Sequence, residues 1–341
     1  MRQFLVIVVG LAVIAAEVLL GVRTFFPDAM EKGQDMADEI IAAKKSILDK
    51  ATPEDLAWAS NSEVITVGVD PNFYPLEMFD ERGRYSGLGG DYLRLLSKMT
   101  GLNFKPAKAA DWATIEEQAR DGKIDIFMAA AKTGKRSDYM SFTPPYITMP
   151  GIIMTRKDSG LRDIGIDDLK NKKVAVVRDY SWHDYLKEFQ PEITAVPAKD
   201  TLEALQLVVS GKADAVLDYE FNLLEKIQTG GILQLQAAGD VNSTYGHAIA
   251  VQKNKPELFS LTSMALEQIT PQERKILAEK WLNQGRPAGE ERHLQWLFFF
   301  LVQAVLVCMC LNLFVERQAR RMTLENIRLL CQGAEKIQHG A

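Results

Sequence analysis

The sequence predicts a two-lobed α/β domain that is flanked by two transmembrane helices. Strands and helices alternate in two consecutive units between about residues 62 and 283, and this alternation is typical of parallel sheets with helices on both faces. On each side of the two units lies an apolar stretch long enough to cross a membrane, residues 4–22 and residues 294–315.

The composition is that of a globular protein with a hydrophobic core. The chain has 341 residues, of which 47% are hydrophobic and 25% charged. Its formal net charge of −5, without a basic stripe, argues against nucleic-acid binding. The three cysteines lie outside residues 26–292, so no disulfide stabilises that region, and the four histidines form no cluster. We therefore expect no metal, no cofactor and no catalytic residues.

The first apolar stretch belongs to a predicted N-terminal transmembrane anchor, residues 1–26. A cleaved signal peptide is the alternative, but the apolar run is long for one and no small-x-small cleavage site closes it. Glu17 lies near the middle of the run, where a carboxylate is costly. We expect Glu17 to be protonated or paired with a polar group of a neighbouring helix.

The second apolar stretch predicts the orientation of the chain. Trp296 lies at its entry as an interfacial anchor, and Arg317, Arg320 and Arg321 follow its end. Because positive charges favour the cytoplasmic side, both termini are predicted to be cytoplasmic and residues 27–292 to lie outside. Residues 316–341 are predicted to form a cytoplasmic helical tail.

Residues 27–61 are predicted to form a juxtamembrane helical segment. Apolar residues recur at roughly helical spacing between Met36 and Leu48, which suits packing on the domain itself or on a second copy of the chain. Thr52 and Pro53 are typical of the first positions of another short helix.

The two α/β units are predicted from hydrophobic periodicity and from the residues that begin and end helices. The first unit should contain strand 64–69, helix 90–100, strand 103–106, helix 112–121 and strand 124–130. The second should contain a helix from residue 167, strand 173–177, helix 181–188, strand 193–196, helix 202–210 and strand 213–217. Ligands of open α/β sheets bind beyond the carboxyl ends of the strands, so the loops there form the candidate site.

The loop after strand 124–130 carries the clearest binding signal. Lys132, Thr133 and Arg136 follow its apolar residues directly. A strand end with small residues, a hydroxyl and a guanidinium can offer backbone N–H groups and a planar pair of donors to one carboxylate. A basic surface turn is the alternative for this stretch taken alone.

Six pieces of the sequence, in their order and spacing, resemble a known family. Those of the first unit are VGVDPNFYPLEMFDERGRYSGLGGDYLRLL, ADW and DGKIDIFMAAAKTGKRSDYMSFTPPY. Those that follow are DDLKNKKVAVVRDYSWHDYL, TLEALQLVVSGKADAVLD and NKPELFSLTSMALEQITPQERKILAEKWL. Together they resemble the amino-acid-binding family of periplasmic solute-binding proteins (family 3, type II Venus flytraps), of the kind fused to bacterial membrane sensor kinases.

The resemblance covers about residues 62–283 and implies a periplasmic-binding-protein-like fold. Lobe 1 would take residues 62–154 and 245–283, and lobe 2 residues 155–244. The resemblance also implies ligand-binding roles for residues at the strand ends. These are a polar contact at Asp70, stacking aromatics at Phe73 and Trp112, backbone groups from Ala129 to Ala131, the Thr-x-x-Arg pair Thr133 and Arg136, the turn from Arg178 to Ser181, and an acidic residue for an amino group at Asp218.

Some of these residues also fit a purely structural role, and two differences from the family pattern leave the identity of the ligand undecided. Phe73 and Trp112 could be core aromatics, and we interpret Asp91 as a structural residue at a helix start. The loop before Arg136 is one residue shorter than usual in the family, with Lys132 where an apolar residue is expected. By strict counting the acidic position falls at Tyr219, next to Asp218. The ligand is therefore an α-amino acid or another small carboxylate.

These signals together predict a sensor in the bacterial inner membrane, with residues 27–292 periplasmic. It would close on a small anionic or zwitterionic ligand and transmit the change through residues 294–315. No kinase module follows in the sequence, so we expect a separate cytoplasmic effector or a missing output domain, and a homodimer would ease signalling. The alternatives are a tethered substrate-binding component of an ABC-type transporter, for which a second span adds nothing, and a dehydratase-like or cell-wall enzyme on the same fold.

Overall fold

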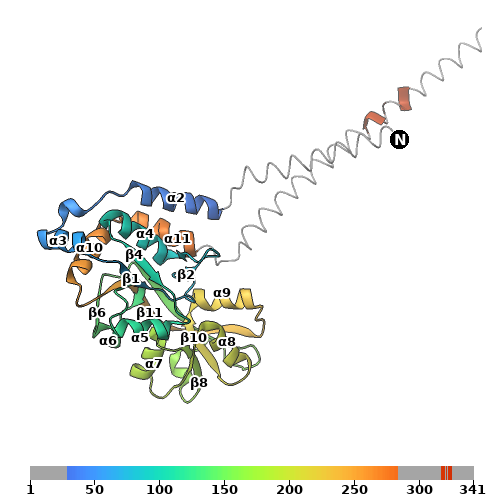
Figure 1. Ribbon diagram of the computed structural model, residues 1–341. Coiled ribbons are helices and arrows are strands. Elements are labelled where there is room, and N and C mark those ends of the chain that lie inside the picture. Colours follow the sequence, from blue (N-terminus) through green and yellow to red (C-terminus); the bar gives the residue numbers. More distant parts are fainter. Residues whose placement is uncertain (1–28, 283–315, 319, 321, 325–341) are drawn as a thin grey trace, which may run out of the picture. The chain divides into compact units, whose positions relative to one another are not determined.

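The computed structural model describes residues 29–282 and a few residues of the tail, 316–318, 320 and 322–324 (Figure 1). Residues 29–282 lie within one compact unit of the chain. Both predicted membrane-spanning stretches lie outside the described residues, and no helix in the described part is long and apolar enough to cross a bilayer. The spans and the orientation of the chain therefore remain predictions.

A nine-stranded mixed sheet runs through the domain. In lobe 1, β1 (Ile65–Gly68) pairs in parallel with β4 (Phe104–Ala107) and β5 (Ile126–Ala131). In lobe 2, β8 (Lys173–Val177) pairs in parallel with β9 (Thr194–Ala198) and β10 (Ala215–Tyr219). These are the strands that the sequence predicts, and the two α/β units in series are confirmed.

Two long antiparallel strands join the lobes. β7 (Ile147–Arg156) and β11 (Leu235–Gln252) pair with each other along most of β7. β11 also pairs with β5 and with the short strand β6 (Met140–Phe142), whereas β7 pairs with β10 from Gly151 onward. The register between β7 and β11 shifts from Asp240 to Thr244, where the pair passes from one lobe to the other. On β7 the pairing with a strand of lobe 2 therefore begins at Gly151.

The helices lie close to where the sequence predicts them, with two exceptions. The helix expected from residue 167 is shorter, and the helix at residues 220–230 is not among the predicted ones. Lobe 1 contains α4 (Leu88–Thr100) and α5 (Trp112–Arg120), and lobe 2 contains α7 (Ser181–Phe189), α8 (Thr201–Val209) and α9 (Glu220–Gly230). Gly101 follows α4 in the left-handed region, with φ of 71°, which ends the helix. The helix expected from residue 167 is only a 3-10 turn, η2 (Ile166–Leu169), because β8 begins at Lys173 and leaves no room for a longer one.

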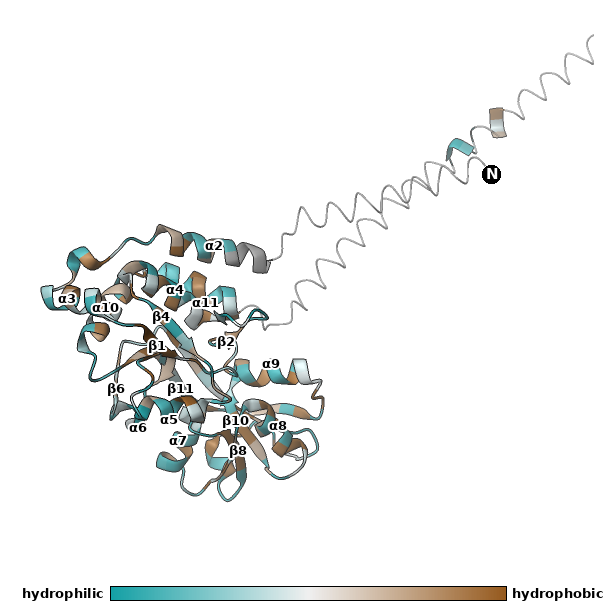
Figure 2. Ribbon diagram, viewed as in Figure 1, coloured by the Kyte–Doolittle hydropathy of each residue, from teal (hydrophilic) through white to brown (hydrophobic). Residues whose placement is uncertain are grey.

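The core lies on both sides of the sheet. β1, β8 and β10 are largely apolar (Figure 2), and every residue of β5 is buried. The main cluster of buried apolar side chains contains residues of both lobes, and a smaller cluster lies under α8 in lobe 2. Hydrophobic burial thus stabilises each lobe and also the region where the lobes meet.

The segment before the first strand packs on lobe 1. α2 (Ala29–Ala43) lies against α4 and α11 (Pro271–Leu282), and α3 (Pro53–Asn61) lies against α10 (Pro256–Glu267) (Figure 1). Lys44 Nζ lies 2.6 Å from Glu273 Oε2, which joins the end of α2 to α11. Thr52 caps α3, because its hydroxyl accepts a hydrogen bond from the N–H of Asp55. The first and last helices of the domain are therefore both attached to lobe 1.

Gly151 provides a test of the packing between the joining strands and lobe 2. A Cβ atom on Gly151 would lie 2.3 Å from Cζ2 of Trp182 in α7, so even alanine would displace the ring or the strand. We expect Gly151→Ala to lower the free energy of unfolding by about 1–3 kcal/mol in urea titrations. Gly165→Ala is the control, because the nearest atom to its Cβ, Asp168 Oδ2, is 4.0 Å away. Equal effects of the two substitutions would contradict this packing.

Candidate functional site

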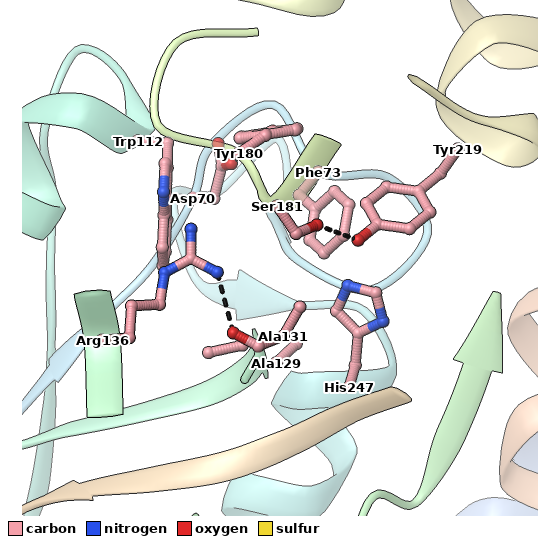
Figure 3. Close-up of a pocket in the computed structure, with 11 residues that line it drawn as sticks. Asp70, Phe73, Trp112, Ala129, Ala131, Arg136, Tyr180, Ser181, Tyr219 and His247 are labelled. Carbon is pink, nitrogen blue, oxygen red and sulfur yellow. Dashed lines mark hydrogen bonds between the residues drawn. The ribbon is translucent and has the colours of Figure 1, made fainter. Parts of the chain in front are cut away.

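A pocket lies between the lobes, beyond the carboxyl ends of parallel strands from both (Figure 3). Most of the predicted site residues line it, and these are Asp70, Phe73, Trp112, Ala129, Ala131, Arg136 and Ser181. Ala130, Tyr180, Tyr219 and His247 complete the lining. The strand-end rule used on the sequence therefore locates a pocket that both lobes share.

Local structure explains why these side chains meet. Asp70 follows β1, and Trp112 opens α5 directly after its N-cap, Asp111. Arg136 lies in the single turn α6 (Gly134–Ser137), whose N-cap is Thr133. Ser181 opens α7 directly after the turn that follows β8. Trp112, Arg136 and Ser181 therefore lie at the starts of helices that follow strands, whereas Asp70 lies in the loop between β1 and the next short strand.

The guanidinium of Arg136 is buried and already bonded to the protein. Its Nη1 donates to the carbonyl of Ala131 at 2.8 Å (Figure 3) and its Nη2 to Glu116 Oε2 at 3.3 Å. It lies 4.9 Å from the ring centre of Trp112, which gives a cation–π contact. Burial opposes its charge, but Glu116, Asp184 and the nearby tyrosines together outweigh burial, and the pKa of Arg136 is raised. Arg136 is thus a permanent cation that faces the pocket.

Glu116 is the main site residue that the sequence analysis does not identify. It is fully buried, accepts a hydrogen bond from Trp112 Nε1 at 3.0 Å, and lies 3.1 Å from Lys135 Nζ. Together with its contact to Arg136, these bonds place a carboxylate of the protein itself beside the predicted carboxylate-binding group. The sequence offers one signal for this role of Glu116, which is its position one helical turn after Trp112 on the same predicted helix.

Lobe 2 contributes the turn at Asp179. The carbonyl of Asp179 accepts hydrogen bonds from Trp112 Nε1 at 3.0 Å and from Arg136 Nη2 at 2.5 Å. Its carboxylate lies 2.8 Å from Lys135 Nζ. Asp179 adopts a left-handed conformation, with φ of 60°, which turns this carbonyl toward lobe 1. One residue of lobe 2 is therefore held by three residues of lobe 1.

A second polar contact and an aromatic cluster also join the lobes. The hydroxyl of Tyr180 donates to Asp70 Oδ2 at 2.5 Å. The ring of Phe73 lies 5.5 Å from that of Tyr180, 5.6 Å from Tyr219 and 5.2 Å from His247. The cavity that remains has a volume of about 20 Å³, which is room for about one water molecule. A ligand of amino-acid size therefore requires the lobes to move apart.

Burial controls the protonation of the carboxyl groups around the pocket. It raises the pKa of Asp70 to about 6, although the hydrogen bond from Tyr180 opposes the shift. It also raises the pKa of Glu77 to about 8 and that of Asp218 to about 7. Glu77 supports Asp70, because its Oε2 accepts the backbone N–H of Asp70 at 3.0 Å. The acidic side of the pocket therefore holds protons more tightly than exposed carboxylates do.

His247 reaches the pocket from β11. Its side chain is 1% exposed, and its Nδ1 has no hydrogen-bond partner among the described residues. Burial and the charge of Arg136 lower the pKa of His247 to about 3, so the ring is neutral. Nε of Arg136 is likewise without a partner in the described part of the chain. These are polar groups of the pocket region whose bonding capacity is unused.

Three predicted residues do not line the pocket. Arg178 is exposed, because its backbone continues the pairing with β9 and the reversal comes only at Asp179. Thr133 acts on Arg136 only through the backbone, since its hydroxyl accepts the N–H of Arg136. Asp218 is buried in lobe 2, where its Oδ2 accepts the hydroxyl of Thr201 at 2.6 Å. Lys132, which stands where the family has an apolar residue, is exposed and does not line the pocket either.

Comparison with known proteins identifies the family. Residues 65–284 match the bacterial extracellular solute-binding proteins, family 3. The chain belongs to this family.

Two curated relatives are sensors. The chain is 26% identical over 259 residues to the sensor protein EvgS of Escherichia coli K12 and 26% identical over 226 residues to the virulence sensor protein BvgS of Bordetella pertussis. These matches cover 75% and 66% of this chain but only 21% and 18% of the two sensors.

Solved structures confirm the two-lobed Venus-flytrap fold. The crystal structure of the B. pertussis BvgS periplasmic domain matches with a TM-score of 0.62 at 24% identity, over 74% of this chain and 49% of that one. The BvgS periplasmic VFT2 domain alone matches with a TM-score of 0.60 at 25% identity, over 68% of this chain and 98% of that domain. The resemblance stated from the six sequence pieces is thereby confirmed.

Asp70 should make stability depend on pH. Because burial raises its pKa from 3.8 to about 6, the folded protein binds more protons than the unfolded chain between these values. The stability that Asp70 contributes is therefore present at low pH and lost as the pH rises through about 6. The free energy of unfolding of Asp70→Asn, minus that of the unsubstituted chain, should increase between about pH 4 and pH 7 in urea titrations. A constant or falling difference would contradict the raised pKa.

Proposed function

We propose that the chain is an extracytoplasmic sensing domain whose lobes open and close around a small ligand. The observation that carries this proposal is the group of bonds between the lobes inside the pocket, from Tyr180 to Asp70 and from Arg136 and Trp112 to the carbonyl of Asp179. These bonds use the same donors that a ligand would use. Ligand binding and lobe contact therefore compete, and this competition makes the position of the lobes depend on the ligand.

The ligand that we propose is an amino acid or a similar small zwitterion. Its carboxylate would replace the carbonyl of Asp179 at Arg136 and Trp112. Glu116 already neutralises the guanidinium, so a plain anion gains less there, whereas a cationic group on the same ligand would be attracted by Asp70. A small carboxylate without an amino group is the alternative ligand.

The signal would leave the domain through its terminal helices. α2 and α11 both pack on lobe 1, so ligand binding would move lobe 2 against a fixed platform. In the sequence α11 leads to the predicted span 294–315 and the predicted cytoplasmic tail 316–341. Output would then pass to a cytoplasmic effector or an output domain, with two chains paired. The sensor relatives support this arrangement, since they match the chain over a domain that is a small part of their own length.

Delivery of solute to a transporter is the second candidate. The L-cystine-binding protein TcyA of Bacillus subtilis is 23% identical over 228 residues, which is 82% of its length. A tethered binding protein needs one anchor, so the predicted second span favours the sensor.

Arg136→Gln tests the ligand site. We expect it to reduce the binding free energy for an amino-acid ligand by about 2–5 kcal/mol, because a buried charged donor is lost. Calorimetry of the chain with a panel of amino acids and small carboxylates measures this effect. Arg178→Gln is the matched control, since this exposed arginine does not line the pocket. Unchanged affinity in Arg136→Gln, or equal losses in both variants, would contradict the proposed role.

Tyr180→Phe tests the contact between the lobes. The substitution keeps the ring beside Phe73 but removes the donor to Asp70, which costs about 1–3 kcal/mol when the partner stays buried. We expect a larger radius of gyration in X-ray scattering as the lobes separate. Tyr185→Phe is the control, because its ring packs on Trp182 and its hydroxyl bonds to no described residue. An unchanged radius in Tyr180→Phe would show that this bond does not hold the lobes.

A further inference from the structure

A second and larger cavity lies on lobe 1, outside the cleft between the lobes. Its volume is about 320 Å³, compared with about 20 Å³ for the pocket between the lobes. It is bounded by α4, by β4 and its following loop, and by a hairpin of β2 (Met78–Phe79) and β3 (Tyr85–Ser86). This volume is within the range of small-molecule sites.

The lining of this cavity combines apolar walls with cations. The walls are Phe79, Tyr85, Leu93 and Pro106, and the cations are Arg84, Arg94 and Lys108. No acidic residue is among the lining residues. Lys108 Nζ lies 5.1 Å from the ring centre of Phe79, and no carboxylate of the described residues forms an ion pair with it. The arrangement suits a ligand with an apolar body and a negative charge.

The nearby charges do not cancel. Arg84 pairs with Asp80 at 2.7 Å, and Arg94 pairs with Asp91 at 2.6 Å and with Asp38 at 2.8 Å. Asp91 in addition holds the buried Lys280 of α11 at 2.7 Å. This group contains three carboxylates, those of Asp80, Asp91 and Asp38. It contains four cations, which are the three that line the cavity and Lys280. The group therefore has an excess of one positive charge. A single negative charge would balance it.

We propose that this cavity binds an amphiphilic monoanion, a carboxylate carried on an aromatic or aliphatic body, and that it is a regulatory site separate from the cleft. The carboxylate lies between Lys108, Arg84 and Arg94, and the apolar body lies against Phe79 and Leu93. None of these residues lines the pocket between the lobes.

Arg94 connects the cavity to the terminal helices. It bridges Asp38 of α2 and Asp91 of α4, and Asp91 also accepts the indole N–H of Trp281 in α11 at 2.8 Å. A ligand carboxylate at Arg94 competes with Asp38, which loosens α2 from lobe 1. Binding in the cavity therefore acts on the helix that leads to the predicted N-terminal anchor.

Tyr85 connects the same cavity to the cleft. Its hydroxyl donates to Glu77 Oε1 at 2.6 Å, and Glu77 Oε2 accepts the N–H of Asp70, whose carboxylate accepts the hydroxyl of Tyr180 in lobe 2. Two hydrogen bonds thus connect a wall residue of the cavity to Asp70, whose bond to Tyr180 joins the lobes. A ligand that shifts Tyr85 changes the position of Asp70 through this chain of bonds.

Titration of the full chain with phenylacetate tests the site. We expect binding that Lys108→Gln weakens about tenfold, as expected for the loss of one charge-assisted contact. Lys105→Gln is the matched control, because this exposed lysine of β4 does not line the cavity. Phenethylamine has the same body with a positive charge, and acetate has the charge without the body, so both should bind at least about tenfold more weakly.

Each result decides the proposal. It is overturned if phenylacetate does not bind, if acetate or phenethylamine binds equally well, or if Lys108→Gln has no larger effect than Lys105→Gln. Hydrogen exchange of α2 should become faster when phenylacetate is bound, and unchanged exchange would overturn the regulatory role of Arg94. Binding by the cleft is measured with Arg136→Gln and amino acids, so failure of either site is seen independently.

Discussion

The carbonyl of Asp179 is the point on which the contact between the lobes depends. A left-handed turn of lobe 2 presents it to Trp112 and Arg136 of lobe 1, and the carboxylate of the same residue pairs with Lys135. Both donors are buried and both also contact Glu116 Oε2 within lobe 1, so the group that would lose its partners if the lobes separated is the carbonyl of Asp179. In this structure lobe 2 is held at these donors by the carbonyl that its own turn presents.

Glu116 compensates the buried positive charge of Arg136. A buried guanidinium without a carboxylate would be strongly destabilising, and Glu116 supplies the carboxylate from within lobe 1. Because Glu116 and Arg136 both belong to lobe 1, their pairing does not depend on a bond from lobe 2. The site thereby separates two tasks. Glu116 supplies the charge partner of Arg136 within lobe 1, and Asp179 supplies the contact with lobe 2.

Local patterns in the sequence are sufficient to predict most of the helices and short strands of the fold. The short parallel strands and the helices between them follow from apolar runs, caps and glycines, and the strand-end rule then places Asp70, Trp112 and Arg136 in one pocket. β11 does not follow from such patterns, because its middle passes through Gly239, Asp240 and Asn242 and its pairing register shifts there. Tertiary contacts therefore determine this strand.

The residues missed at the site depend on contacts between distant parts of the chain. His247 arrives from the last strand, and the partners of Glu116 lie in another loop, so neither role is visible in a local window. The family resemblance implies a site role for Arg178, but the chain reverses only at Asp179, so Arg178 stays at the strand end and its side chain is exposed. Fine positions in a loop depend on single backbone angles that residue type does not determine.

The attachment of α2 and α11 to the same lobe has a mechanical consequence. The pair is joined directly by Lys44 and Glu273, and each helix also packs on α4. A pulling force applied to the two ends of the domain would be carried by this helix pair and would bypass lobe 2. A load applied at these two ends would therefore strain the helix contact before it reached the region between the lobes, which would be insulated from mechanical force.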